Sequence, residues 1–247
     1  MPKFKVGTDD FKVLRDEGGY FVDKSLLIKE VIDGSDALLL PRSRRFGKTL
    51  NLSMLRYFFE QSPADRSYLF QDLAIASLPD VMAHQGKYPV IYLSLKDIKG
   101  ANWEESWARL RDTISSLYLD HTYLIASLPS IRQRDFDAII NDSGGKTVFG
   151  NSLKNLITYL HDFHKQPVVV LIDEYDSPMI EAWEKGYYPH MADFMRSWLV
   201  GGLKPVAGTA VYRSVVTGIL RVAKESIGRQ YGAALAACLI GVRLAAL

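Results

Sequence analysis

Two short segments of this sequence carry side chains whose types and order suit the binding of a nucleotide. The first reads PRSRRFGKT at 41–49; the apolar run Ala37–Leu40 precedes it and an amphipathic stretch follows it. A strand that enters a helix through a glycine-containing turn directs backbone N–H groups and the positive end of the helix dipole at an anion. We therefore predict a phosphate-binding loop (Walker A) in which Gly47 admits the phosphates, Lys48 contacts the β- and γ-phosphates and Thr49 binds Mg²⁺.

The loop departs from the usual template in one place. The pattern GxxxxGK[ST] has a glycine five residues before Gly47, where this chain has Arg42, and arginine reaches positive φ only at a cost. A strand-to-helix turn with a cationic rim is therefore the alternative for this segment alone. Arg44 and Arg45 are candidate phosphate contacts, and the alternative for them is a role as solvated loop charges.

The second segment, VVVLIDE at 168–174, is an apolar strand that ends in two acids. Ligands of open α/β sheets bind outside the carboxyl ends of the strands, so both segments open on the same edge if their strands are neighbours. We predict that Asp173 holds Mg²⁺ and that Glu174 orients or deprotonates an attacking water. For this run in isolation, acids that cap the following turn are the alternative.

A third strand, ending SVVTG at 214–218, brings a polar residue to the same kind of position. Thr217 is a candidate sensor of the γ-phosphate, and Arg221 is a candidate phosphate contact. A simple turn at the end of the strand is the alternative.

The elements that must position these residues alternate between strands and helices. Helical spacing of apolar residues is found in Lys24–Ile32 and Thr49–Phe59. The helix-rich stretch Ala101–Phe163 is expected to be an insertion between the second and third strands. The pattern predicts an α/β fold with a mostly parallel sheet flanked by helices. The four predicted strands are Ala37–Leu40, Tyr88–Leu95, Pro167–Ile172 and Val211–Thr217.

Length and composition fit one large globular domain. The chain has 247 residues, 48% of them hydrophobic, and its formal charge of +2 gives no basic stripe for nucleic acid. A single cysteine, Cys238, and an N-terminus without an apolar leader favour a soluble cytoplasmic protein. A membrane span is not expected, because the apolar stretch Tyr231–Leu247 is short and contains Arg243.

Taken together, four segments resemble the AAA-ATPase-like family of bacterial and archaeal proteins, over roughly Phe11 to Ile227. They read YFVDKS at 20–25, PRSRRFGKT at 41–49, LIDEYD at 171–176 and TGI at 217–219. That family also lacks the first glycine of the loop. The resemblance implies a P-loop NTPase domain over 1–227 that binds ATP and Mg²⁺. It further implies Lys48 and Thr49 as the phosphate and Mg²⁺ residues, with Asp173 and Glu174 as the acidic pair.

The C-terminal residues 228–247 depart from this family and form an atypical apolar tail, rich in alanine and leucine, which we expect to be a surface helix. A truncated or frameshifted reading frame would give such an ending, and so would a genuine short variant. Family members commonly continue into a nuclease-like domain of the PD-(D/E)XK type, which we do not find here. The resemblance therefore implies an effector, either a protein partner or a nuclease-like domain absent from this chain.

The leading functional hypothesis is a Mg²⁺-dependent ATPase that serves as a nucleotide switch, with Glu174, Lys48 and Thr217 as the catalytic residues. The first alternative is an interaction protein that senses nucleotide without hydrolysing it. The second is a P-loop small-molecule kinase. We rank the kinase last because a strand-end Asp-Glu pair favours water as the acceptor.

Overall fold

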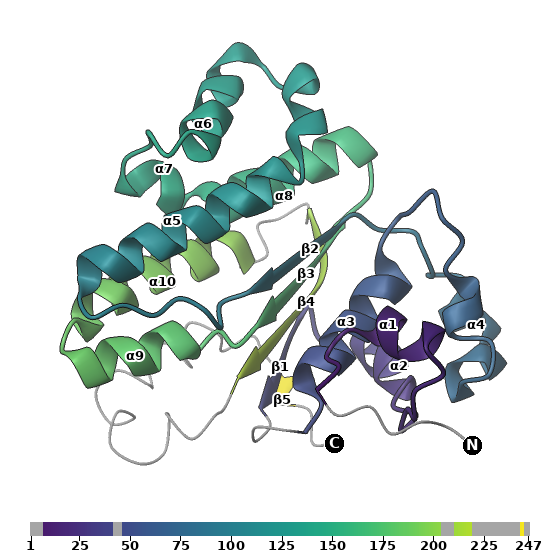
Figure 1. The fold of residues 1–247 in the computed structure, drawn as a ribbon. Helices are drawn as coiled ribbons and strands as arrows, with labels where there is room; N and C mark the ends of the chain where they lie inside the picture. The colour runs from purple at the N-terminus through teal and green to yellow at the C-terminus, as the bar shows by residue number, and fades with distance from the viewer. Residues whose placement is uncertain (1–6, 42–45, 204–209, 219–242, 245–247) are drawn as a thin grey trace.

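The computed structural model describes residues 7–41, 46–203, 210–218 and 243–244, which form a parallel sheet with helices on both faces (Figure 1). The strands lie in the order β2-β3-β4-β1-β5, and each neighbouring pair is parallel. The predicted α/β fold with a parallel sheet is confirmed, and each predicted strand is found with slightly different bounds. The strands are β1 Ala37–Pro41, β2 Val90–Ser94, β3 Val168–Asp173, β4 Val211–Gly218 and β5 Arg243–Leu244.

Strand β3 is buried along its whole length because helices cover both faces of the sheet. Val169 and Leu171 point into the core on one face, whereas Val168, Val170 and Ile172 point into the core on the other. A strand covered on both sides needs an uninterrupted apolar run rather than an alternating one, which is the pattern that the sequence carries here.

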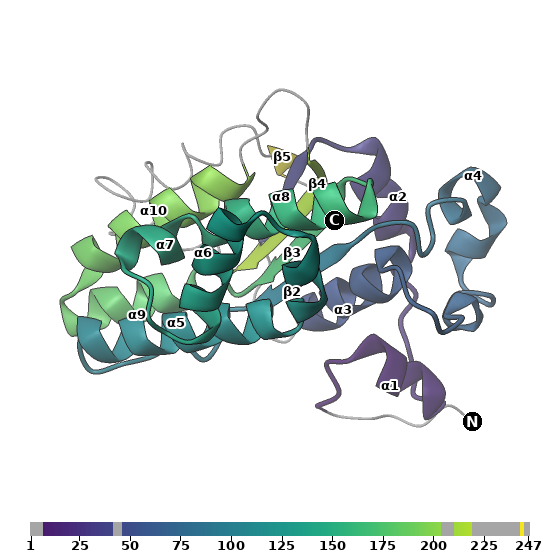
Figure 2. The same ribbon diagram turned by 90° about the horizontal axis from the view of Figure 1, so that it is seen from above.

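The N-terminal helices cover one face of the sheet, as the view from above shows (Figure 2). Helix α1 packs against α3: the Phe11 N–H donates to Ser53 Oγ across 3.0 Å, and the Tyr57 hydroxyl donates to the Asp10 carboxylate across 2.9 Å. This layer also contains 3₁₀ turns at Ser67–Leu69 and Ala74–Ser77. Its helices are α1 Phe11–Asp16, α2 Leu26–Asp33, α3 Lys48–Phe59 and α4 Pro79–Met82.

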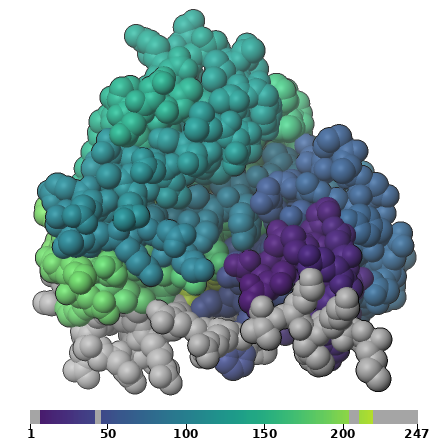
Figure 3. Space-filling view, in the orientation of Figure 1, coloured from purple at the N-terminus to yellow at the C-terminus, as the bar shows by residue number. Residues whose placement is uncertain are grey.

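Six helices and the 3₁₀ turn Thr122–Ser127 belong to the other layer, part of which is the teal block of Figure 3. Leu110 of α5 and Leu160 of α8 share one core with Val170 of β3, so these two helices cover the sheet directly. Helix α6 packs on the outside of α5. That this stretch is an insertion stays a prediction. The helices are α5 Trp103–Leu119, α6 Ser130–Ile140, α7 Lys146–Gly150, α8 Ser152–His164, α9 Ser177–Lys185 and α10 Tyr188–Leu203.

The structure describes two residues of the C-terminal tail. Arg243–Leu244 form strand β5, parallel to β1, so the expected helix is wrong at these two positions. The rest of 228–247, with Cys238, lies outside the described residues. Within the described ranges, no helix combines the length and the apolar character that crossing a bilayer requires.

Candidate functional site

Helix α3 begins at the predicted phosphate loop, and its first residue is Lys48. Gly47 precedes it in the left-handed conformation, with φ +72°. A Cβ added to Gly47 would meet no atom within 4 Å, so the backbone conformation and not crowding favours glycine here. Gly47 has no side chain that could cap the first turn of α3, which is the arrangement suited to an anion. Arg44 and Arg45 lie outside the described residues, and their contact with phosphate stays a prediction.

The carboxylate of Asp173, at the end of β3, is the centre of the site. Its side chain is 1% exposed. Thr49 Oγ1 donates to Asp173 Oδ2 across 2.6 Å, and Thr217 Oγ1 donates to Asp173 Oδ1. The backbone N–H of Glu174 also donates to Oδ1, across 3.0 Å. Hydrogen bonds of this kind satisfy a buried carboxylate, which would otherwise be costly to remove from water.

These contacts join the start of helix α3 to the ends of strands β3 and β4. We expected the two motifs to share an edge if β1 and β3 were neighbours, but β4 lies between them. Thr217, on the intervening strand, is fully buried and bonds to Asp173 directly. The structure thus brings together Thr49, Asp173 and Thr217, which sequence reasoning had assigned to three different motifs.

Glu174 has an unusual backbone conformation directly after β3. Its φ is +50°, a left-handed value that costs a residue with a Cβ about 1–2 kcal/mol. Ser177 Oγ donates to Glu174 Oε2 across 2.9 Å, and the Glu174 N–H is 3.4 Å from Thr217 Oγ1. Sequence reasoning missed Ser177. Its signal was a hydroxyl three residues after the strand-end acid, at the start of α9.

A cavity of about 580 Å³ lies beside this network. Lys48, Thr49, Glu174 and Ser177 line it, so the predicted phosphate, metal and base residues face a common space. Two lysines that follow β2 also line the cavity, opposite in charge to the further carboxylates of the lining. Sequence reasoning missed both lysines. The rule that ligands bind at the carboxyl ends of parallel strands could have found them. The remaining lining residues are Thr8, Asp9, Gly47, Leu50, Lys96, Lys99, Ile180, Glu181 and Glu184.

The Asp23–Lys24 pair, which is typical of the family that the sequence resembles, lies at the entry to α2. Asp23 Oδ1 accepts from the N–H of Ser25 across 2.8 Å, and Oδ2 accepts from the N–H of Ala74 across 2.7 Å. Burial opposes the charged form, but these hydrogen bonds outweigh it and lower the pKa of Asp23. Asp23 therefore holds the entry to α2 against the turn at Ala74, and the next residue, Lys24, lines a second cavity together with Lys48.

The donor set around Asp173 fits Mg²⁺. The carboxylate of Asp173 and the hydroxyl of Thr49 are hard oxygen ligands, and Mg²⁺ is usually bound through one or two carboxylates, substrate phosphates and waters. In the described part of the chain, no group of three or more His, Cys, Asp or Glu side chains could form a cage for a metal by itself. Such a site would therefore depend on oxygen atoms from a bound nucleotide.

Comparison with curated proteins gives one distant relative. The chain is 27% identical to the "Uncharacterized protein in vnfD 5'region" of Azotobacter chroococcum mcd 1 over 180 residues. The match covers 72% of this chain and 30% of that protein, so the chain spans less than a third of its relative's length. No solved structure matches the chain.

Comparison with protein families gives a match over most of the sequence. The AAA-ATPase-like family, described as predicted AAA-ATPase, matches residues 5–228. This range contains β1 to β4, the turn before α3 and the acids that follow β3. The chain belongs to the AAA-ATPase-like family of predicted AAA-ATPases.

Proposed function

We propose that this chain binds ATP together with Mg²⁺ and hydrolyses it, as a nucleotide switch for a protein partner or a nuclease-like domain outside the chain. Family membership supports a nucleotide-binding, ATPase-like module. The observation that carries the finer proposal is the convergence of Thr49 and Thr217 on the buried carboxylate of Asp173. It is further supported by the cavity beside this network, which Lys48 and Thr49 at the start of α3 and the carboxylate of Glu174 line.

Binding of the triphosphate is assigned to the start of α3. The ammonium group of Lys48 lies on the β- and γ-phosphates, and the backbone of Gly47 allows their close approach. Thr49 and Asp173, which are hydrogen-bonded to each other, would hold Mg²⁺ directly or through water. When bound, Mg²⁺ neutralises charge on the phosphate oxygens and fixes their orientation.

Hydrolysis is assigned to water activated by Glu174. The water oxygen bonds to the γ-phosphorus while the bond from that phosphorus to the β–γ bridging oxygen breaks. ADP leaves with the electron pair, and a proton of the water passes to Glu174. Lys48 stabilises the charge that develops on the phosphate oxygens. Thr217 orients Asp173 and contacts the γ-phosphate from the middle strand.

A second candidate function is nucleotide sensing with little turnover. It is supported by the hydrogen bond from Ser177 to the Glu174 carboxylate, which gives one oxygen of the proposed base a partner within the protein. In this case ATP binding alone would set the conformation that a partner recognises.

The test combines thermal unfolding with a phosphate-release assay. Mg·ATP at one hundred times its dissociation constant should stabilise the wild-type fold by about 2.7 kcal/mol, and Lys48→Ala should abolish this gain. Glu174→Gln should keep the gain and lose about 10²- to 10⁴-fold in phosphate release. Lys154→Ala, at an exposed position on α8, is the matched control for Lys48→Ala.

The two candidate functions give different results. Stabilisation by ATP with release that needs Glu174 supports the ATPase. Stabilisation without measurable release, in the wild type as in Glu174→Gln, identifies the sensor. If Mg·ATP leaves the unfolding midpoint of a cooperatively folded wild type unchanged, both nucleotide functions are wrong.

A further inference from the structure

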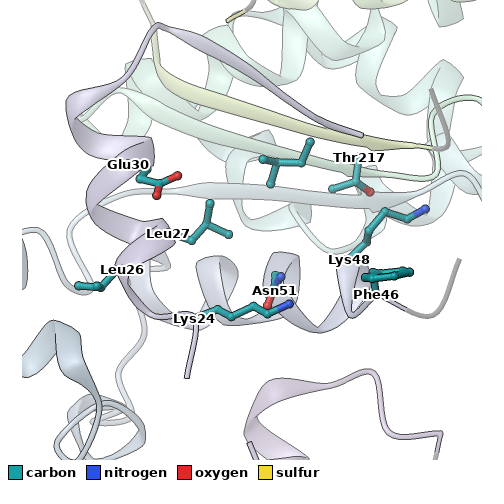
Figure 4. Close-up of a pocket in the computed structure, with 9 residues that line it drawn as sticks. Lys24, Leu26, Leu27, Glu30, Phe46, Lys48, Asn51 and Thr217 are labelled. Carbon is teal, nitrogen blue, oxygen red and sulfur yellow. The ribbon is translucent and has the colours of Figure 1, made fainter. Parts of the chain in front are cut away.

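A second cavity, of about 430 Å³, meets the triphosphate site at Lys48. Lys48 lines both cavities, and the second one continues from it between α2 and α3 beneath β1 and β4 (Figure 4). Its size is in the range of cavities that hold small organic ligands. A group attached to phosphates that lie on Lys48 can therefore enter it directly. The lining residues are Lys24, Leu26, Leu27, Glu30, Leu40, Phe46, Lys48, Asn51 and Thr217.

Most of the surface that lines this cavity is apolar, and two of its four apolar side chains are open to solvent. Leu27 and Leu40 are buried. Leu26 is 49% exposed and Phe46 is 59% exposed, and they stand at opposite ends of the cavity in Figure 4. Large apolar side chains that face one cavity favour a ligand with an apolar surface of its own. A triphosphate alone offers none.

Glu30 and Asn51 are two of the five polar or charged side chains that line the same space, with Lys24, Lys48 and Thr217. Glu30 comes from α2 and Asn51 from α3, and both are directed toward the middle of the cavity (Figure 4). Within the described part of the chain, neither side chain makes a hydrogen bond or an ion pair. A few convergent polar groups in an apolar cavity are what fixes the orientation of a bound small molecule.

We propose that this cavity holds the adenosine part of ATP, and that Glu30 selects adenine through its 6-amino group. The inference rests on the proposed function, because it requires the triphosphate to lie on Lys48. A carboxylate only accepts hydrogen bonds. The 6-amino group of adenine is a donor, whereas hypoxanthine carries an acceptor oxygen at that position, which the carboxylate repels. Asn51 can supply the complementary donor and acceptor pair to adenine.

The experiment measures the affinities of three Mg²⁺-bound ligands by calorimetry: ATP, inosine triphosphate and inorganic tripolyphosphate. Leu26→Ala should lower the affinity for ATP about tenfold and leave the affinity for tripolyphosphate unchanged, because the substitution removes apolar contact with the base only. Leu119→Ala, an equally exposed leucine on α5, is the matched control. Leu26 is outside the core, so its truncation does not threaten the fold.

Glu30→Gln tests the recognition of the base. A glutamine amide can donate to the 6-oxygen of hypoxanthine as well as accept from adenine, so the preference for ATP over inosine triphosphate should fall about tenfold. Glu104→Gln, at an exposed position on α5, should keep the wild-type preference. An unchanged preference in Glu30→Gln would overturn the role of Glu30.

The same measurements separate this inference from the proposed function. Suppose that Lys48→Ala lowers the affinity for tripolyphosphate but Leu26→Ala and Glu30→Gln bind all three ligands as the wild type does. The triphosphate site is then supported, and the assignment of the second cavity to adenosine is wrong. If the wild type does not bind tripolyphosphate and ATP binding is insensitive to Lys48→Ala, the proposed function itself is wrong.

Discussion

Ser177 donates a hydrogen bond to the carboxylate of Glu174 across 2.9 Å, and both side chains line the cavity beside Lys48. Glu174 follows β3 directly and Ser177 is the first residue of α9. The contact therefore couples the proposed catalytic base to the start of a helix. One oxygen of the proposed base therefore already has a hydrogen-bond partner within the protein, which an attacking water would have to replace.

Removal of this hydroxyl should make the protein a faster enzyme. We expect Ser177→Ala to raise basal phosphate release several-fold, up to about tenfold, because the attacking water no longer competes with this hydroxyl for the Glu174 carboxylate. ATP affinity should not change. Single-turnover phosphate release is the measurement. Ser197→Ala, which removes a hydroxyl on α10 that donates to the Phe194 carbonyl, should behave as the wild type. Slower release in Ser177→Ala would show that Ser177 orients Glu174 and does not restrain it.

The hydroxyl of Thr217 should matter for stability as well as turnover. Thr217→Val keeps the shape of the side chain but leaves the buried Asp173 with one donor fewer. We expect a loss of about 1–3 kcal/mol in the free energy of unfolding, measured by urea titration, together with slower phosphate release. Thr217→Ser restores the donor and should recover most of both losses. If Thr217→Val is as stable as the wild type, the hydrogen bonds from Thr49 and from the Glu174 N–H are sufficient to stabilise the buried carboxylate of Asp173.

Gly218 is required by close packing. A Cβ at this position would lie 2.6 Å from a ring carbon of Tyr175 and 2.7 Å from an Asp176 carboxylate oxygen. Tyr175 is 7% exposed, and burial, with the charge of Asp176, raises the pKa of its phenol. Neither neighbour can move freely, so Gly218→Ala should destabilise the fold by about 1–3 kcal/mol. Gly201→Ala, where an added Cβ meets nothing within 4 Å, is the control in the same urea titration.

Two histidines at the opposite end of β2 should make stability depend on pH. His164 Nε2 lies 3.0 Å from the Tyr123 hydroxyl, and His121 Nδ1 lies 3.4 Å from it. Burial lowers the pKa of both histidines below 6.5. As the pH falls below about 6.5, the unfolded chain binds protons that the folded protein does not, so the free energy of unfolding decreases.

The measurement is urea unfolding between about pH 7.5 and pH 5.5. The double variant His121→Gln, His164→Gln should show a flatter decrease than the wild type, since it removes both groups whose pKa is lowered. His190→Gln, on α10, should keep the wild-type slope. Equal slopes for all three proteins would assign the pH dependence to other groups.

The local parts of the site could be predicted from sequence because each has a local signal. Gly47 to Thr49 follow an apolar run and begin a helix. Asp173 comes at the end of an uninterrupted apolar run, which forms β3. Strand order has no such signal. Apolar runs predict where strands occur but not which strands pair with each other. The position of β4 between β1 and β3 could therefore not be derived from them.

The side-chain contacts of the site were beyond sequence reasoning for a related reason. The bond between Thr49 and Asp173 joins residues 124 apart in the sequence. Thr49 lies at the start of α3 and Asp173 at the end of β3, and no local pattern predicts that these two positions meet. The hydroxyl of Ser177 is close to Glu174 in sequence, yet its direction depends on the left-handed backbone of Glu174. Lys96 and Lys99 differ, because the rule that ligands bind beyond the carboxyl ends of parallel strands could have found them.

The insertion of β4 between β1 and β3 also has a kinetic consequence. The Ser214 hydroxyl donates to the Asp36 carbonyl, 178 residues away in the sequence, and such distant pairings give a high contact order and slow folding. During synthesis β1 and β3 are complete before β4, the strand that pairs with both, has been made. Until then β1 and β3 each have an edge whose backbone N–H and C=O groups are unpaired. The nascent chain is therefore exposed to aggregation until β4 has left the ribosome, so chaperones should raise its yield more than that of a protein with locally paired strands.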